Sequence, residues 1–214
     1  SAYKIPDLIR RLVSDSHCVT PILTDSGAMF VTDMTLETVS GQSVYRSQKG
    51  SGATISHLDL AKKGDVLVIA PASANTIARL AHGLADDFLS TLCLAYQGPK
   101  IIVPAMHTEM IENPLVQANL ERLESVGYQI LGPVSGDLAC GDKGLGRMID
   151  PDVIRLAIEA ISQSGGAVFN QNLSGKKIVI SSGGTQESID PVRCIRNHAS
   201  GKLGSTLAHL AAFR

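Results

Sequence analysis

Residues 137–148 carry the clearest capacity for chemistry in this chain. They read Asp-Leu-Ala-Cys-Gly-Asp-Lys-Gly-Leu-Gly-Arg-Met and place one thiol, Cys140, close to Gly141, Gly144 and Gly146. Glycines at this density let a backbone turn sharply and lie close against another surface. The segment predicts either a mobile flap that brings a thiol to a bound substrate or a glycine-rich turn with an inert cysteine, which is often just a small buried residue.

A second set of polar side chains follows the most apolar segment of the chain, residues 65–70 (Asp-Val-Leu-Val-Ile-Ala). Ser73, Asn75 and Thr76 come directly after it. In a parallel sheet, ligands bind where strands end and helix N-termini present free N–H groups. These side chains therefore predict contacts to a phosphate or a polar ring edge, or, in the plainer interpretation, a helix cap.

Two histidines stand in comparable positions. His107 follows the apolar residues 101–104, so it is a candidate for reading a ligand in the same cleft or for capping a helix. His57 lies just ahead of the segment 65–70. A single histidine can be a catalyst or a structural residue, and position alone leaves both interpretations open.

Short apolar runs alternate with amphipathic stretches along the chain, which indicates a parallel sheet with crossover helices. We therefore predict an α/β fold, a doubly wound parallel sheet of the Rossmann-like flavoprotein kind. The predicted helices are 5–13, 75–82, 113–126 and 151–162, and the predicted strands are 19–23, 65–70, 101–104 and 129–131.

A polar, glycine-containing stretch at 162–174 predicts a domain boundary. We expect a first domain at 1–165, a linker at 166–175 and the start of a second α/β domain at 176–214. That second part is predicted to open with a strand at 177–181 and to end within a helix at 208–213. Because the chain begins and stops inside helices, we expect it to be a fragment cut at both ends.

The composition of the chain limits the kinds of molecule that it is expected to bind. The chain is 44% hydrophobic and 18% charged, carries a formal net charge of −1 and has no tryptophan. These values favour an ordinary globular domain and argue against nucleic-acid and membrane partners. The four cysteines show no Cys-x-x-Cys spacing, so we expect no metal site, no disulfide framework and a cytoplasmic location.

Three segments together, 65–91, 104–110 and 138–148, resemble the flavin-dependent cysteine decarboxylases in order and spacing. Within that family they are most similar to the phosphopantothenoylcysteine decarboxylases of coenzyme A biosynthesis. Residues 175–204 resemble the opening of the phosphopantothenate–cysteine ligases. This order of the two parts is that of the bifunctional bacterial-type enzymes.

The resemblance implies a set of functional residues in four groups. They are His57 and Cys140 for catalysis; Thr24, Phe30, Ser73, Ala74, Asn75 and Thr76 for FMN; Met106, His107, Gly141 and Arg147 for the substrate; and Arg193 and Asn197 for the ligase part.

The implied reaction is FMN-dependent decarboxylation of 4′-phosphopantothenoylcysteine to 4′-phosphopantetheine. The flavin would accept and return a hydride, and Cys140 would donate a proton to the product. The complete ligase would use CTP and Mg²⁺, but only its start is present, so we expect no ligation by this chain alone. The family also implies homotrimers, or a dodecamer built of trimers.

Two departures and two alternatives accompany this interpretation. The family has a first strand and a glycine turn ahead of the positions of residues 2–4, which would form part of the flavin phosphate site, and this sequence does not include them. The family usually has Asn in a Pro-x-Met-Asn motif where this chain has His107, which can still donate one N–H or, when protonated, two. The alternatives are a non-catalytic regulatory FMN-binding protein and a related flavin-fold enzyme acting on another substrate. The presence of both His57 and Cys140 argues against the first, and the ligase-like tail argues against the second.

Overall fold

The computed structural model describes residues 1–46, 57–138, 141–163, 173 and 175–212. The chain divides into two compact units, Ser1–Val168 and Phe169–Arg214. Among the described residues, no helix combines the length and the apolar character needed to cross a membrane.

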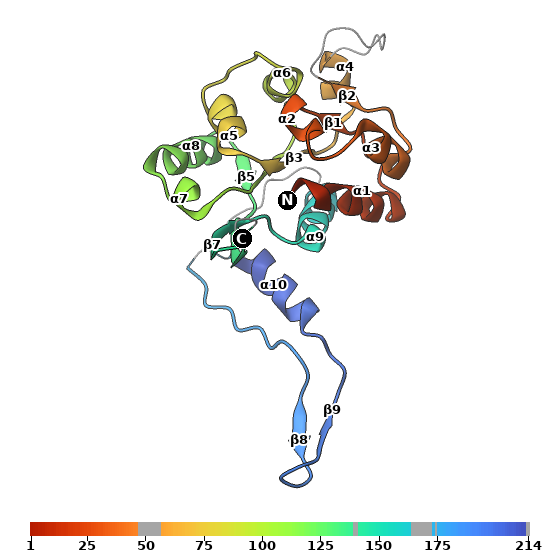
Figure 1. Ribbon diagram of the computed structural model, residues 1–214, viewed down its shortest axis with the longest axis vertical. Coiled ribbons are helices and arrows are strands. Elements are labelled where there is room, and N and C mark those ends of the chain that lie inside the picture. The colour runs from red at the N-terminus through yellow and green to blue at the C-terminus, as the bar shows by residue number, and fades with distance from the viewer. Residues whose placement is uncertain (47–56, 139–140, 164–172, 174, 213–214) are drawn as a thin grey trace. The chain divides into compact units, whose positions relative to one another are not determined.

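Unit 1 is built around parallel strands (Figure 1). The strands β3 (Leu67–Ala72), β4 (Lys100–Pro104) and β5 (Tyr128–Ile130) pair in that order, and all are parallel. A second parallel pair joins β1 (Ile22–Leu23) to β2 (Tyr45–Arg46). The predicted α/β fold with parallel strands is therefore confirmed, and its central strand β4 is apolar because both of its faces are covered.

Helices connect and cover these strands. Their bounds are α1 (Ile5–Ser14), α2 (Asp25–Ala28), α3 (Asp33–Ser40), α4 (His57–Lys63), α5 (Ala74–Ala81), α6 (Phe88–Ala95), α7 (Thr108–Ile111), α8 (Pro114–Ser125) and α9 (Pro151–Gln163), with a 3₁₀ turn at Ala2–Lys4 before α1. The four helices predicted from the sequence agree with α1, α5, α8 and α9 to within a residue or two at each end.

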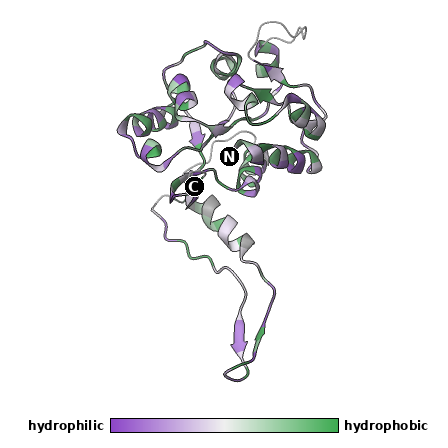
Figure 2. Ribbon diagram, viewed as in Figure 1, coloured by the Kyte–Doolittle hydropathy of each residue, from purple (hydrophilic) through white to green (hydrophobic). Residues whose placement is uncertain are grey.

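The core of unit 1 lies where α5 and α8 pack on the β3–β4–β5 sheet. Its fully buried members include Ile77 of α5, Ile102 of β4 and Leu123 of α8. Hydrophobic and hydrophilic residues alternate along these helices (Figure 2), as expected for helices with one buried and one exposed face. Burial of such side chains supplies about 1.5–3 kcal/mol each toward folding.

Ion pairs join α1 to α9 at the edge of this unit. Arg11 Nη1 donates to Asp152 Oδ1 at 2.6 Å, and Arg155 Nη1 donates to Asp15 Oδ2 at 2.9 Å. The first pair is the more consequential, because Asp152 is buried and its carboxylate needs a partner there.

The glycine-rich segment contains a turn, which is compatible with both interpretations of its sequence. Its flanks form an antiparallel hairpin of β6 (Val134–Asp137) and β7 (Lys143–Arg147). The turn is closed by backbone bonds from Leu138 N–H to the Asp142 carbonyl at 2.8 Å and from Gly141 N–H to the Leu138 carbonyl at 3.0 Å. Residues 139 and 140, and with them Cys140, lie outside the described residues.

Unit 2 contains the antiparallel hairpin of β8 (Gln186–Ser188) and β9 (Cys194–Arg196), followed by α10 (Lys202–Ala212). The strand predicted at 177–181 is wrong, because this segment forms no ladder with any described residue and leaves Val179 exposed. A run of β-branched residues indicates a strand only where a partner strand pairs with it. The helix predicted at 208–213 begins earlier than expected, at Lys202.

Candidate functional site

A cavity of ≈1290 Å³ runs along β1 and β3 of unit 1 and extends past their carboxyl ends. Apolar side chains line much of it, among them Leu8 and Ile9 of α1 and Leu67 and Ile69 of β3. Polar side chains are gathered where the strands end. This arrangement, an apolar body with a few convergent polar groups, is typical of small-molecule and cofactor sites.

Ser73 marks the end of β3 and the start of α5. Its side-chain oxygen accepts from the Thr76 N–H at 3.3 Å, and the two hydroxyls lie 3.2 Å apart. Ser73 therefore does cap a helix, as the plainer interpretation held, and it lines the cavity as well. Both functions are compatible because an N-terminal helix turn keeps further N–H groups free for an anion.

Thr24 repeats this arrangement at the end of β1. Its hydroxyl accepts from the Gly27 N–H at 3.1 Å and caps the short helix α2. A third strand end contributes Ala105, whose N–H donates to the Ala72 carbonyl at 3.0 Å and so holds the ends of β3 and β4 together. Three strand ends thus meet at this cavity, as expected for a parallel sheet.

Five of the six side chains predicted to contact FMN line the cavity. They are Thr24, Phe30, Ser73, Asn75 and Thr76, and the sixth, Ala74, is the first residue of α5 between two of them. Phe30 is three-quarters exposed, so its ring stands at the rim rather than in the core. Tyr45 also lines the cavity and stacks on Phe88, with ring centroids 6.0 Å apart.

A cation at this cavity was not singled out from the sequence. Arg79 of α5 lines it and donates to Asp86 Oδ1 at 3.2 Å and to Asp87 Oδ2 at 2.7 Å. Arg79 follows Asn75 by four residues, so helical spacing places the two on one face of α5. That spacing is the signal by which sequence reasoning could have found it.

Asp87 joins this cation to the next helix. Its carboxylate accepts from the Ser90 N–H at 2.7 Å and forms a capping box at the start of α6. Burial by itself would raise the pKa of Asp87, but the Ser90 N–H and hydroxyl and the Arg79 guanidinium lower it by more. The net pKa lies below the ordinary value, so the group is a carboxylate at neutral pH.

The remaining predicted residues fall elsewhere. In the part of the chain that the structure describes, His57 begins α4 and is not among the residues that line the cavity. Met106, His107, Gly141 and Arg147 gather instead at the β6–β7 hairpin. The Arg147 side chain lies over Gly136 of the facing strand, where an added Cβ would come within 3.0 Å of Arg147 Cδ.

The hairpin rests on the segment that follows β4. Met106 N–H donates to the Gly146 carbonyl at 3.0 Å. Gly146 has a φ of +143°, and a Cβ there would overlap the Met106 carbonyl. A Cβ on Gly144 would likewise overlap the Thr108 hydroxyl. Glycine is required at 146 for both its backbone angle and this close approach.

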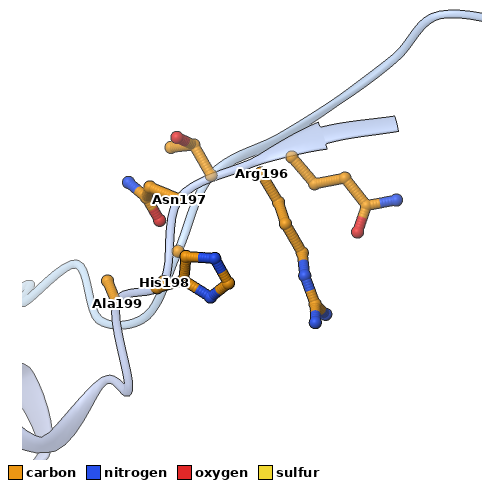
Figure 3. Close-up of a pocket in the computed structure, with 7 residues that line it drawn as sticks. Arg196, Asn197, His198 and Ala199 are labelled. Carbon is orange, nitrogen blue, oxygen red and sulfur yellow. The ribbon is translucent and has the colours of Figure 1, made fainter. Parts of the chain in front are cut away.

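Unit 2 contains a smaller hollow of ≈310 Å³ beside the β8–β9 hairpin (Figure 3). Asn197, predicted for the ligase part, lines it, and its N–H donates to the Thr185 carbonyl at 3.4 Å. Arg196 and His198 also line it and were not predicted. Arg193 lies instead in the hairpin turn, where its guanidinium pairs with Asp190 at 2.6 Å.

Comparison with known proteins gives a consistent result. Residues 1–162 match the family described as Flavoprotein, and residues 173–214 match the family described as DNA/pantothenate metabolism flavoprotein C-terminal domain. The coenzyme A biosynthesis bifunctional protein CoaBC of Haemophilus influenzae is 43% identical over 217 residues, covering 100% of this chain and 53% of that protein. The CoaBC protein of Escherichia coli K12 is 41% identical and is covered to 52%. The chain therefore spans about half the length of these curated relatives.

Solved structures resemble unit 1. A PPC decarboxylase mutant complexed with pantothenoylaminoethenethiol is 30% identical with a TM-score of 0.68, covering 76% of this chain and 92% of that one. The FMN-binding protein AtHal3 is 31% identical with a TM-score of 0.64, covering 76% of this chain and 91% of its own. The FMN-dependent cysteine decarboxylase SpaF is 30% identical, also with a TM-score of 0.64, covering 78% and 91% of the two chains.

Proposed function

This chain belongs to the Flavoprotein family, and from that membership we propose that unit 1 binds FMN and decarboxylates 4′-phosphopantothenoylcysteine to 4′-phosphopantetheine. The relatives named for coenzyme A biosynthesis and the neighbour named as a PPC decarboxylase support this choice of reaction. The observation that carries the proposal is the cavity at the ends of β1, β3 and β4, which is lined by the polar side chains expected for a flavin.

The cavity suits FMN in size and chemistry. Its ≈1290 Å³ is ample for a cofactor, since ligand pockets commonly measure about 300–1,000 Å³. Thr24, Ser73, Asn75 and Thr76 would hold the polar edges of the group, and Phe30 would cover it at the rim. Ala74 would contribute backbone contacts at the start of α5, where helix N–H groups favour negative charge.

Bound FMN would supply an acceptor and later a donor for the hydride that activates the substrate toward loss of carbon dioxide. The chain's own residues would handle binding and protons. We assign His57 as the active-site histidine, since a histidine side chain can take up and release a proton near neutral pH. Cys140 would donate its thiol proton to the substrate carbon that has lost carbon dioxide.

The substrate would be held at the β6–β7 hairpin. Met106 bonds to Gly146 of this hairpin, Gly141 lies in its turn, and Arg147 offers a guanidinium suited to a phosphate or a carboxylate. Their assignment as substrate contacts follows from the family resemblance and is part of the proposal. His107, which the resemblance also implies as a substrate contact, is left out of this set because both of its ring nitrogens contact protein carboxylates.

Unit 2 would be the start of a CTP- and Mg²⁺-dependent phosphopantothenate–cysteine ligase. We assign residues 1–165 to the decarboxylase domain, 166–175 to a linker and 176–214 to this ligase part. The match of residues 173–214 to the C-terminal family supports the assignment. Asn197 and Arg193 would serve the ligase, and the hollow beside Asn197 adds Arg196 and His198 as further polar groups for an anionic substrate.

We also propose that the protein is a cytoplasmic homo-oligomer, a trimer or an assembly of trimers. Light scattering coupled to size-exclusion chromatography of the complete protein tests this. A monomeric mass would contradict it.

The proposed reaction is tested on the purified complete protein by visible absorption and by release of carbon dioxide from phosphopantothenoylcysteine. A bound-flavin spectrum with release of carbon dioxide is expected. Bound flavin without release would favour a regulatory flavoprotein or an enzyme for another substrate. The absence of bound flavin after incubation with FMN would overturn the proposal.

Replacement of the proposed proton donor gives a sharper test. Cys140→Ser should still release carbon dioxide but should stop before the final product, leaving an oxidised, decarboxylated compound that mass spectrometry identifies. Cys194→Ser is the matched control, because Cys194 is an exposed thiol in unit 2. Normal formation of 4′-phosphopantetheine by Cys140→Ser would exclude the thiol as the donor.

A further inference from the structure

We infer that His107 and Asp142 form a positioning pair that holds the β6–β7 hairpin against the end of β4. The inference deepens the proposed function, on which its catalytic consequence rests. It concerns which partner the His107 ring serves: two protein carboxylates rather than a substrate carboxylate.

Both nitrogens of the His107 ring face acidic side chains. Nε2 lies 3.4 Å from Asp142 Oδ2, and Nδ1 contacts Glu109 Oε2. The two carboxylates come from different elements, Glu109 from α7 and Asp142 from the turn of the hairpin. Each ring nitrogen therefore faces a protein carboxylate, and neither is left for a ligand.

The contact of His107 with Asp142 restrains the residue that closes the turn between β6 and β7. The backbone carbonyl of Asp142 accepts the Leu138 N–H at 2.8 Å, so the residue that His107 contacts also closes the turn. Cys140 precedes Asp142 by two positions in the sequence. A link that restrains Asp142 therefore restrains one side of the turn to which the proposed proton donor belongs.

The hairpin is also attached to the segment after β4 at its strand β7, so the contact of His107 with Asp142 restrains a different part of it. The hairpin already rests on the Met106–Thr108 backbone through the Met106–Gly146 hydrogen bond and the close approach at Gly144. Those contacts fix the strand β7, whereas the contact of His107 with Asp142 reaches the turn. An asparagine at 107, as in most of the family, has a shorter side chain and lacks the second ring nitrogen that contacts Glu109.

The pair is weak taken alone, because Asp142 is exposed and His107 is one-third exposed. Its loss should therefore speed hydrogen exchange of the β6 and β7 amides by about two- to fivefold, the range of exposed ion pairs. We expect this for His107→Asn and for Asp142→Asn, measured on the complete protein by mass spectrometry. The double variant should exchange no faster than either single one, because both remove the same contact.

Two further variants separate this role from general disturbance of the hairpin. Asp137→Asn removes a carboxylate of the same hairpin that pairs with Lys143 at 3.7 Å and not with His107. It leaves the His107–Asp142 contact intact, so its effect on exchange should add to that of His107→Asn in a double variant. Asp142→Glu keeps a carboxylate and should restore slow exchange. Additive effects of His107→Asn and Asp142→Asn, or non-additive effects of His107→Asn and Asp137→Asn, would overturn the inference.

The exchange readout is independent of the reaction, so the two proposals can fail separately. If the pair positions the turn for catalysis, His107→Asn and Asp142→Asn should lower kcat by a similar factor while KM changes little. An unchanged kcat in both variants, in a parent that decarboxylates its substrate, would overturn the catalytic part. A parent with no decarboxylase activity would instead overturn the proposed function and leave the exchange result to decide the pair.

Discussion

Replacement of Gly146 by alanine should detach the β6–β7 hairpin from the segment that follows β4. Gly146 has a φ of +143°, a region that side chains with a Cβ rarely enter, and an added Cβ would overlap the Met106 carbonyl. The backbone strain alone costs about 1–3 kcal/mol. Relief of the overlap requires β7 to move and so to lose the Met106–Gly146 hydrogen bond, worth about 1 kcal/mol.

The sum predicts that Gly146→Ala lowers the free energy of unfolding by about 2–4 kcal/mol. Urea unfolding followed by circular dichroism measures this loss. Hydrogen exchange of the Met106 amide reports the local part of it, because this N–H donates to the Gly146 carbonyl at 3.0 Å in the parent. We expect the Met106 amide to exchange faster in the variant even under conditions where the whole chain stays folded.

Gly127→Ala is the matched control for this variant. Gly127 also has a positive φ, +92°, but an added Cβ there would meet no atom within 4 Å. The control therefore carries backbone strain without the overlap, and its Met106 amide should exchange as in the parent. The reasoning is refuted if the Met106 amide keeps its protection in Gly146→Ala, or if both variants expose it equally.

Two further predictions concern ionisable groups of unit 1. Because the folded-state pKa of Asp87 is lowered, its contribution to the free energy of unfolding should be present above about pH 4 and be lost as pH falls further. Asp87→Ala should lower the free energy of unfolding by about 1 kcal/mol at pH 7 through loss of the helix cap. In urea unfolding at a series of pH values, the acid limb of the profile, which is the fall in stability below about pH 4, should be flatter for this variant. Burial raises the pKa of the Cys93 thiol to about 12, so iodoacetamide at pH 8 should modify Cys18 and Cys194, which are exposed, and leave Cys93 unmodified until the chain unfolds. Rapid modification of Cys93 in the native protein, or an acid limb unchanged by Asp87→Ala, would contradict the respective prediction.

The sequence by itself determined the fold class and the location of the cavity. Apolar runs such as 65–70 become buried strands because burial of β-branched side chains on both faces is the dominant favourable term. Ser73 and Thr24 follow such strands, and parallel strands end at one edge of a sheet. Their meeting at one cavity therefore required no information beyond the order of strands and helices.

The ends of the elements and the pairing of the strands were harder to predict from the sequence. The run at 177–181 has the composition of a strand but finds no ladder among the described residues, since pairing depends on a partner remote in sequence. The glycines of 137–148 predicted a flap or a turn, but they did not predict that the residues on either side of the turn pair as a hairpin. Glycine density indicates where a chain can turn or approach another segment closely, and it does not reveal which segment lies opposite.

Only the tertiary structure decided how charged side chains are partnered. Arg79 meets Asp87 across the end of a helix, and His107 meets Asp142 from 35 positions away in the sequence. Such contacts depend on the relative placement of whole elements. Local propensity and hydrophobic spacing carry no information about that placement. The residue types could be recognised from the sequence, but the partner of each ring nitrogen and carboxylate is fixed by packing.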